Sequence, residues 1–219
     1  MAFTVHAVMP GVWHIVDCMG VCMTLLEGEN AAMLVDTGYG IEDVADFMRH
    51  MTDLPLTVFL THNHHDHAMG ARCFPETYML EADMADWRMF TDDKMRRRVL
   101  TQAIGKNLPV DEKTFLAGEI PLPKVMKPGV IDLGGLTAEI IEAPGHTPGS
   151  AVVYVPERKL LLSGDDWNPC TWLFFPQALG LREYRSNMRG IQQLPFEKVL
   201  CPHREALYDR WMFDDFFNA

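Results

Sequence analysis

The sequence predicts an α/β protein in which two β-sheets pack face to face between outer helices, a four-layer αββα sandwich. Short strand-like segments, separated by turns that contain Gly or Pro, occur in both halves of the chain. In each half, side chains that can bind a metal come directly after such a strand, and a helical pattern follows. The 219 residues are enough for one full core, so residues 1–219 are expected to form a single domain.

The first half of the chain is expected to form one sheet that begins as an antiparallel meander. Predicted strands span residues 3–8, 12–17, 21–27, 31–36, 56–60 and 76–80, and predicted helices span 41–50 and 68–73. The fourth strand ends at Val35-Asp36-Thr37-Gly38. A carboxylate at this strand end could orient a metal ligand through a hydrogen bond, or it could form a plain Asx turn.

Residues 81–120 differ in composition from the rest of the chain and are expected to form a helical insertion. A stretch rich in Met and aromatic residues, 82–90, predicts one helix, and the residues from Lys94 onwards predict another. The run Arg96-Arg97-Arg98 could bind an anion or lie on a solvated helix face. The insertion could act as a lid beside a site or as a contact surface in a homo-oligomer.

The second half of the chain is expected to form the other sheet. Predicted strands span residues 130–133, 136–142, 151–155, 159–162 and 198–201, and predicted helices span 181–193 and 204–217. One strand leads into Pro144-Gly145-His146-Thr147-Pro148-Gly149, where Pro and Gly predict a sharp turn that presents a histidine. Another ends in Ser163-Gly164-Asp165-Asp166, and the last is followed by Pro202-His203. Metal-ligating side chains therefore recur after strands of this half as well.

The densest cluster of such side chains is His62-Asn63-His64-His65-Asp66-His67, directly after a buried strand. His62 and His64 are two residues apart and can converge on one ion, whereas Asp66 and His67 are adjacent and can face a second. Nitrogen and oxygen donors without thiolate suit zinc, with manganese and iron as alternatives. A solvated His-rich loop is disfavoured because a hydrophobic strand and a helical segment flank the cluster.

Bulk properties narrow the classes of partner. The net charge of −11 disfavours nucleic acid as a substrate, because phosphate binding needs a basic surface. No apolar run approaches the length of about 18 residues that a membrane span needs, and the first residues lack the pattern of a signal peptide. The five cysteines are odd in number and scattered, so reduced thiols and a cytoplasmic location are expected. The expected partner is a small-molecule substrate.

Taken together, the motifs resemble those of the metallo-β-lactamase superfamily. The resemblance rests on the 62–67 cluster, the 144–149 turn, Ser163-Gly164-Asp165 and His203, in that order along the chain. It implies the metallo-β-lactamase fold and a hydrolase with a dinuclear metal site. It would place three histidines on the first metal, Asp66 and two histidines on the second, and Asp165 between both. In full, the implied ligands are His62, His64 and His146 for the first metal and Asp66, His67 and His203 for the second, with Asp36 holding a ligand in place.

The aspartate at position 165 indicates a branch of the superfamily. Glyoxalase II and lactonase-like members carry a bridging Asp there, whereas many true β-lactamases carry a Cys, so a hydrolase outside the antibiotic-resistance class is expected. Asp166 is the alternative bridge. Two features depart from the family: Pro202 precedes the last histidine where a Gly is usual, and few residues follow His203. The C-terminal substrate domain of glyoxalase II is therefore not expected.

The expected reaction is hydrolysis of a small acyl substrate, such as a thioester, a lactone or another ester; the resemblance implies the hydrolysis, and the net charge and the aromatic residues near the site favour the acyl substrate. Two divalent ions roughly 3.5–4 Å apart can share a hydroxide by lowering the pKa of water to about 7. Asp66 could accept the proton. The alternatives are a mononuclear-iron oxidoreductase of the sulfur-dioxygenase type, a phosphodiesterase, and a metal-binding protein without catalytic activity.

Aromatic side chains near the second set of motifs are candidates for the walls of the site. Trp167, Trp172, Phe174 and Tyr184 are expected to line a substrate pocket, unless they pack the insertion onto the body of the protein. An apolar pocket would favour an uncharged or acyl substrate. His65 lies between two implied ligands and is expected to point away from the metals.

Overall fold

The computed structural model describes residues 3–218, which form two β-sheets. Within these residues the first sheet has the spatial order β1 (Thr4–Met9), β2 (Val12–Val16), β3 (Cys22–Glu27), β4 (Ala32–Val35), β5 (Leu56–Phe59), β6 (Tyr78–Met79) and β7 (Lys124–Val125). The second has the order β13 (Tyr208–Asp209), β12 (Lys198–Leu200), β11 (Leu160–Leu162), β10 (Ala151–Val155), β9 (Thr137–Glu142) and β8 (Gly129–Asp132). The first sheet begins antiparallel at β1–β4, as predicted, and continues parallel from β4 to β7.

Alternating side chains place each sheet between two apolar layers. In β4, Met33 and Val35 belong to the core between the sheets, whereas Leu34 belongs to the core on the outer side. In β10, Val153 faces the core between the sheets and Val152 faces outwards. Both faces must be covered because successive side chains of a strand point to opposite faces.

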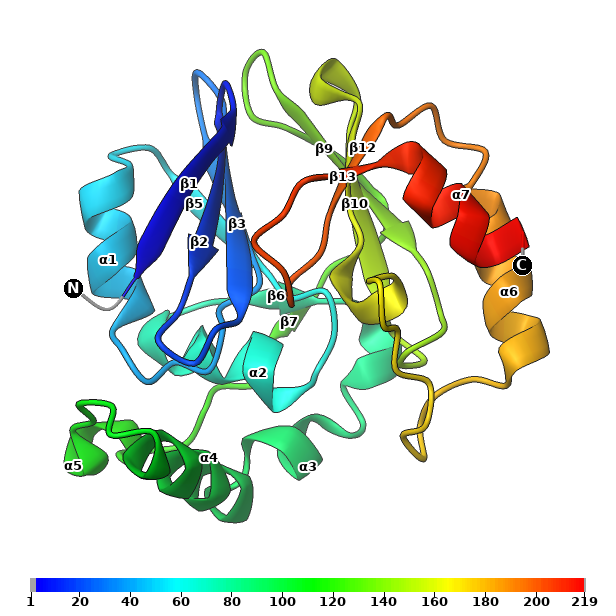
Figure 1. Cartoon of the computed structure of the whole chain (residues 1–219). Coiled ribbons are helices and arrows are strands. Elements are labelled where there is room, and N and C mark those ends of the chain that lie inside the picture. Colours follow the sequence, from blue (N-terminus) through cyan, green and yellow to red (C-terminus); the bar gives the residue numbers. More distant parts are fainter. Residues whose placement is uncertain (1–2, 219) are drawn as a thin grey trace.

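Helices cover these outer faces (Figure 1). The helix α1 (Val44–Met51) begins at Asp43, whose side chain accepts a hydrogen bond from Asp46 N, and it lays Val44 and Met48 on the first sheet. The helices α6 (Leu181–Ile191) and α7 (Arg210–Asn218) cover the second sheet, with Met188 among the buried residues. The predicted four-layer αββα sandwich is confirmed.

The helical insertion predicted at 81–120 is also confirmed. It contains a 3₁₀ turn (Glu81–Asp83) and the helices α3 (Trp87–Thr91), α4 (Asp93–Gly105) and α5 (Glu112–Phe115). These helices share a core of their own that includes Trp87, Val99 and Phe115. Figure 1 shows α3, α4 and α5 gathered beyond the ends of β6 and β7. The insertion therefore lies next to the edge at which these parallel strands end.

Three segments of the structure differ from the prediction. The helix predicted at 68–73 begins earlier, at His65. It consists of α2 (His65–Ala68) followed by a 3₁₀ turn (Met69–Cys73), so part of the histidine cluster is helical. The strand β7 forms in a Pro-rich passage without periodicity, where it only has to extend the parallel edge beside β6. Residues 204–207 are not helical, because Tyr208 pairs with Val199 of β12 before α7 begins.

No helix within residues 3–218 is long and apolar enough to cross a membrane. All five cysteines, which lie inside this range, are free thiols.

Candidate metal centre

The predicted metal ligands follow strands that end at one edge of the sandwich. His62 comes after β5, His146 after β9, Asp165 after β11 and His203 after β12. In the second sheet these strands run in one direction, because β11 and β12 are parallel and both β9 and β11 pair antiparallel with β10. The loops that follow them therefore meet, although the residues they carry are far apart in the sequence.

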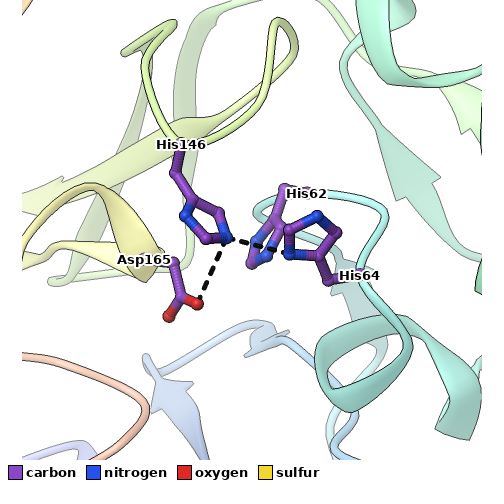
Figure 2. A group of neighbouring side chains, drawn as sticks. All are labelled: His62, His64, His146 and Asp165. Carbon is purple, nitrogen blue, oxygen red and sulfur yellow. Dashed lines mark hydrogen bonds and ion pairs between the residues drawn. The ribbon is translucent and has the colours of Figure 1, made fainter. Parts of the chain in front are cut away.

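One group of donors consists of three histidines and an aspartate. One side-chain atom from each of His62, His64, His146 and Asp165 lies within 4.8 Å of the others, and all four residues are buried. His146 Nε2 is 2.8 Å from His64 Nδ1 and 3.4 Å from Asp165 Oδ2. Figure 2 shows these side chains pointing toward one another from three separate loops. This arrangement surrounds a point that a single ion could occupy.

A second group consists of Asp66, His67 and His203, whose donor atoms also lie within 4.8 Å of one another. His203 Nε2 is 3.7 Å from Asp66 Oδ2 and 3.1 Å from Asp165 Oδ1. His67 Nε2 is 3.4 Å from the same oxygen of Asp165. The Asp165 carboxylate thus lies between the two groups, which is the position that the resemblance implies for a bridging ligand.

The donor atoms themselves fit divalent cations. Within residues 3–218, Nε2 of His62, Nε2 of His67 and Oδ1 of Asp165 are buried and have no hydrogen-bond partner. Buried polar atoms without a partner are costly, so an arrangement that leaves three of them at one place needs a bound group to satisfy them. Imidazole nitrogens and carboxylate oxygens are the donors that bind zinc, manganese or iron.

In several of these histidines, the ring nitrogen that faces away from the centre forms a hydrogen bond with a neighbouring group. His67 Nδ1 donates to Asp36 Oδ2 at 2.9 Å, and His146 Nδ1 donates to the carbonyl oxygen of Trp172 at 2.7 Å. His62 Nδ1 donates at 3.0 Å to the hydroxyl of Thr61, since that hydroxyl itself donates to the Asp36 carboxylate. Such contacts fix the tautomer and orient the other nitrogen toward the metal.

Asp36 lies directly after β4, and its side chain contacts one of the predicted ligands. Its carboxylate accepts from Thr61 N at 2.7 Å and from the Thr61 hydroxyl at 3.0 Å, besides His67. Its φ of 64° is in the left-handed region, which an Asp adopts more readily than most residues. Strained backbone of this kind persists where the surroundings hold it, and it is concentrated at functional sites. Asp36 therefore ties the strand end, the first histidine loop and one ligand together.

Replacing Asp36 with asparagine is expected to weaken metal binding about 10- to 100-fold, the range typical of groups that orient a ligand. Asparagine tolerates the left-handed backbone, so the change removes the charge while preserving the fold. Competition with a chelating indicator measures the affinity. Asp46→Asn, on the exposed face of α1, is the matched control. An affinity equal to that of the control would show that Asp36 does not support the centre.

Burial and neighbouring charges keep Asp165 ionised and His64 neutral, which are the forms that bind metal, whereas His67 holds a proton that a bound metal would displace. Burial disfavours the Asp165 carboxylate, but His67 and His203 hold its pKa well below the usual range. Burial, together with neighbouring His146, lowers the pKa of His64 to about 3. Burial also acts against a charged His67, yet the carboxylates of Asp165, Asp36 and Asp66 raise its pKa well above the usual value. The site is therefore rich in negative charge that attracts a cation.

Asp166 does not share the bridging position with Asp165. Its Oδ1 accepts a hydrogen bond from His146 N at 2.8 Å, and its backbone carbonyl accepts from the Tyr184 hydroxyl. A Cβ on Gly145 would lie 2.7 Å from Asp166 Oδ1, so this turn needs glycine for the close approach. Asp166 holds the turn that presents His146.

Two of the predicted pocket residues are placed in the core. Trp167 and Tyr184 are each 1% exposed and belong to the cluster between the second sheet and the helices α6 and α7. The Trp167 ring packs against Tyr208 and Phe213. The prediction that Trp167 and Tyr184 line a pocket is therefore corrected, because the outer face of the second sheet takes up their large rings.

A cavity of about 710 Å³ opens beside the donors. Its lining includes His64, Asp66 and Asp165 from the centre. The apolar part of the lining consists of Tyr39 from the loop after β4, Met89, Phe90 and Met95 from the insertion, and Trp172, Phe175 and Pro176 from the 172–177 loop. Trp172 is among the residues that line this cavity. Phe174 is 72% exposed and does not line it, although its ring packs on Phe175. His65 belongs to neither donor group, and it lines this cavity.

Two residues of the site, Tyr39 and Asp83, are not among those that the sequence predicts. Tyr39 lines both the large cavity and a smaller cavity of about 270 Å³ next to His203. Asp66 and Trp172 also line both cavities. Burial raises the pKa of Tyr39, and the carboxylates nearby raise it further, so its hydroxyl keeps its proton. Asp83, in the insertion, is buried under the loops that carry the donors.

Asp83 joins the two loops that present the histidines. Its carboxylate accepts from Gly149 N at 2.6 Å, from the Thr147 hydroxyl at 2.7 Å and from Asn63 N at 3.2 Å. A Cβ on Gly149 would lie 2.6 Å from Asp83 N, so the second glycine of the turn permits this contact. Asp83 follows β6, and the only sequence signal that could have indicated it is a carboxylate shortly after a strand.

The αββα sandwich and the His/Asp centre at its edge define a metal-binding hydrolase. The chain belongs to the metallo-beta-lactamase superfamily, whose family model matches residues 16–203. It is 26% identical over 202 residues to the acyl-coenzyme A thioesterase MBLAC2 of Gallus gallus, and the match covers 82% of this chain and 70% of that protein.

Solved structures support the fold independently of close sequence similarity. The metallo-beta-lactamase from Pontibacter korlensis matches with a TM-score of 0.70 at 17% identity, over 99% of this chain and 97% of that one. TTHA1623, solved in a di-iron-bound form, matches with a TM-score of 0.60 at 22% identity, over 89% of this chain and 92% of that one. At these identities the likeness concerns the arrangement of strands and helices.

Proposed function

We propose that the protein hydrolyses acyl thioesters with a dinuclear metal centre. The observation that carries the proposal is the position of the Asp165 carboxylate between two donor groups that line a cavity with apolar walls. The likeness to an acyl-coenzyme A thioesterase supports a thioester as the substrate. Zinc is the proposed metal, because imidazole and carboxylate donors without thiolate suit it, and iron and manganese are the alternatives.

The residues of the centre have two proposed functions, to hold the metal ions and to accept a proton. Divalent ions, when bound, would supply Lewis acidity toward a water molecule and toward the thioester carbonyl. Asp66 is the proposed proton acceptor: its side chain is 14% exposed and lines both cavities, so it can reach a water molecule on either side. Its pKa is lowered by His67 and His65 against the effect of burial, which keeps it ionised.

The cavity walls bind the acyl part and keep bulk water away from it. Phe90 and Phe175 pack against the His64 ring, with ring centroids 4.5 and 5.0 Å away. Gln177 contacts the outer nitrogen of the same ring at 2.9 Å. An acyl chain beside these rings would replace water on apolar surface, which is the main source of affinity for such a chain.

The proposal is tested with a panel of substrates and one variant. The metal-loaded protein is assayed against thioesters, lactones, phosphodiesters and a cephalosporin, and the thioesters are expected to be cleaved fastest. Asp66→Asn is expected to lower kcat about 10²- to 10⁴-fold, because an amide oxygen can bind a cation but cannot take up the proton. Its metal content should remain that of the wild type.

Two results would contradict the proposal. Activity confined to phosphodiesters would show that the substrate is a phosphodiester and not an acyl compound. A kcat for Asp66→Asn equal to that of the wild type, with the same metal content, would show that another group accepts the proton.

A further inference from the structure

The three consecutive arginines of α4 occupy three different environments. Arg96 is buried, and its guanidinium donates to the carbonyl oxygens of Gly118 at 2.6 Å and Ala117 at 3.2 Å, which ties α4 to the end of α5. Arg97 is exposed and pairs with Asp93 at 3.8 Å. Arg98 forms no ion pair within residues 3–218 and lines the large cavity beside the metal centre. One arginine of the run is thus free to bind a ligand.

Arg98 shares its helix face with two other residues of the cavity. Met95 precedes it by three positions and Gln102 follows it by four, which places all three on one side of α4. Among the described residues that line this cavity, Arg98 is the one arginine or lysine. Outside the donor groups, Asp86 is the carboxylate of the lining, and it forms no ion pair with Arg98 among the described residues.

We propose that Arg98, together with Gln102, binds a phosphate or carboxylate group that the substrate carries away from its scissile bond. The inference rests on the proposed function, in which the same cavity holds an acyl thioester. A guanidinium can donate two parallel hydrogen bonds to such a group, and the Gln102 amide adds a further donor. The unpaired arginine within a largely apolar lining therefore selects substrates that combine an uncharged stretch with a distal anion.

The anion can belong to either end of a thioester. A thiol carrier that bears phosphates, such as coenzyme A, would present it on the leaving group. A dicarboxylic acyl group would present it on the acyl side. Three substrates separate these sources: octanoyl-coenzyme A, octanoyl-N-acetylcysteamine, which is uncharged, and the N-acetylcysteamine thioester of octanedioic acid, which carries a free carboxylate.

Arg98→Gln is expected to raise KM about tenfold or more for the substrates that carry the recognised anion, the loss typical of a charge-assisted hydrogen bond. Its KM for octanoyl-N-acetylcysteamine should stay unchanged. Arg97→Gln, one residue away and outside the cavity, should match the wild type on all three. An effect limited to the coenzyme A thioester assigns the anion to the carrier, and one limited to the dicarboxylic thioester assigns it to the acyl group.

The proposal is overturned if Arg98→Gln changes KM equally for all three substrates or for none. If neither the wild-type protein nor Arg97→Gln cleaves a thioester, the proposed function fails. The anion site is then tested separately, by the binding of anions to the variants. Adenosine 3′,5′-bisphosphate and octanedioate are titrated into equally metal-loaded Arg98→Gln and Arg97→Gln proteins, with tryptophan fluorescence as the signal. Weaker binding of either compound to Arg98→Gln supports the anion site, and equal binding of both to the two variants overturns it.

Discussion

Replacing Asp165 with alanine is expected to lower kcat/KM by more than about 100-fold, the upper end of what groups that merely orient a ligand contribute. The side chain lies 3.1 to 3.4 Å from three histidine nitrogens that belong to two donor groups. Its removal therefore takes a ligand from both positions at once. Elemental analysis of the purified variant should find fewer metal ions per chain than in the wild type.

The neighbouring aspartate provides the matched control. Asp166→Asn retains an oxygen that can accept from His146 N, so the turn should still present its histidine. This variant is expected to keep its metal ions and most of its activity. If Asp165→Ala retained full metal content while Asp166→Asn lost it, the bridging role would belong to Asp166.

Replacing Asp83 with alanine is expected to destabilise the protein by about 3 kcal/mol or more, because three buried donors would each lose their acceptor. The donors are Asn63 N, the Thr147 hydroxyl and Gly149 N. Burial raises the pKa of Asp83, and these hydrogen bonds oppose the rise, so the native contacts offset much of the cost of burying the group. Urea unfolding of the metal-free protein measures the loss without a contribution from bound metal.

A residue in the same 3₁₀ turn serves as the control for Asp83. Glu81 is exposed, and Glu81→Ala should change the free energy of unfolding by less than about 0.5 kcal/mol. Equal stability of the two variants would show that the link between the histidine loops is not a source of stability.

Most of the fold could be predicted because its strands are short, apolar and bounded by turn residues. The alternation that places Met33 and Leu34 on opposite faces is a local property, and so is the Gly-Pro turn around His146. The donors follow the strands directly, so a correct strand also locates its ligand in the sequence. The predicted donors lie together in the structure because strands in both sheets end at the same edge.

The pocket walls could not be predicted in the same way. Trp167 and Trp172 are five residues apart in one loop, yet one is 1% exposed in the core and the other is 45% exposed beside the cavity. Composition gives both the same preference for burial, and only the packing of α6 and α7 decides which ring enters the core.

Contacts between residues far apart in the sequence explain why Asp83 and the strands β7 and β13 were not predicted. Asp83 belongs to the site through Thr147 and Gly149, which are more than 60 residues away in the sequence, and no local pattern indicates such a contact. The short strands β7 and β13 form because a neighbouring strand offers free backbone groups, as with Tyr208 beside Val199. Their own residues show little alternation.

Titration of the metal-free protein with Zn²⁺, followed by a competing chelating indicator, tests the dinuclear centre most directly. Two groups of donors joined by one carboxylate predict two tightly bound ions per chain, and the Asp165→Ala variant should lose at least one of them. Binding of a single ion, or of none, by the wild-type protein would contradict the proposed dinuclear hydrolase.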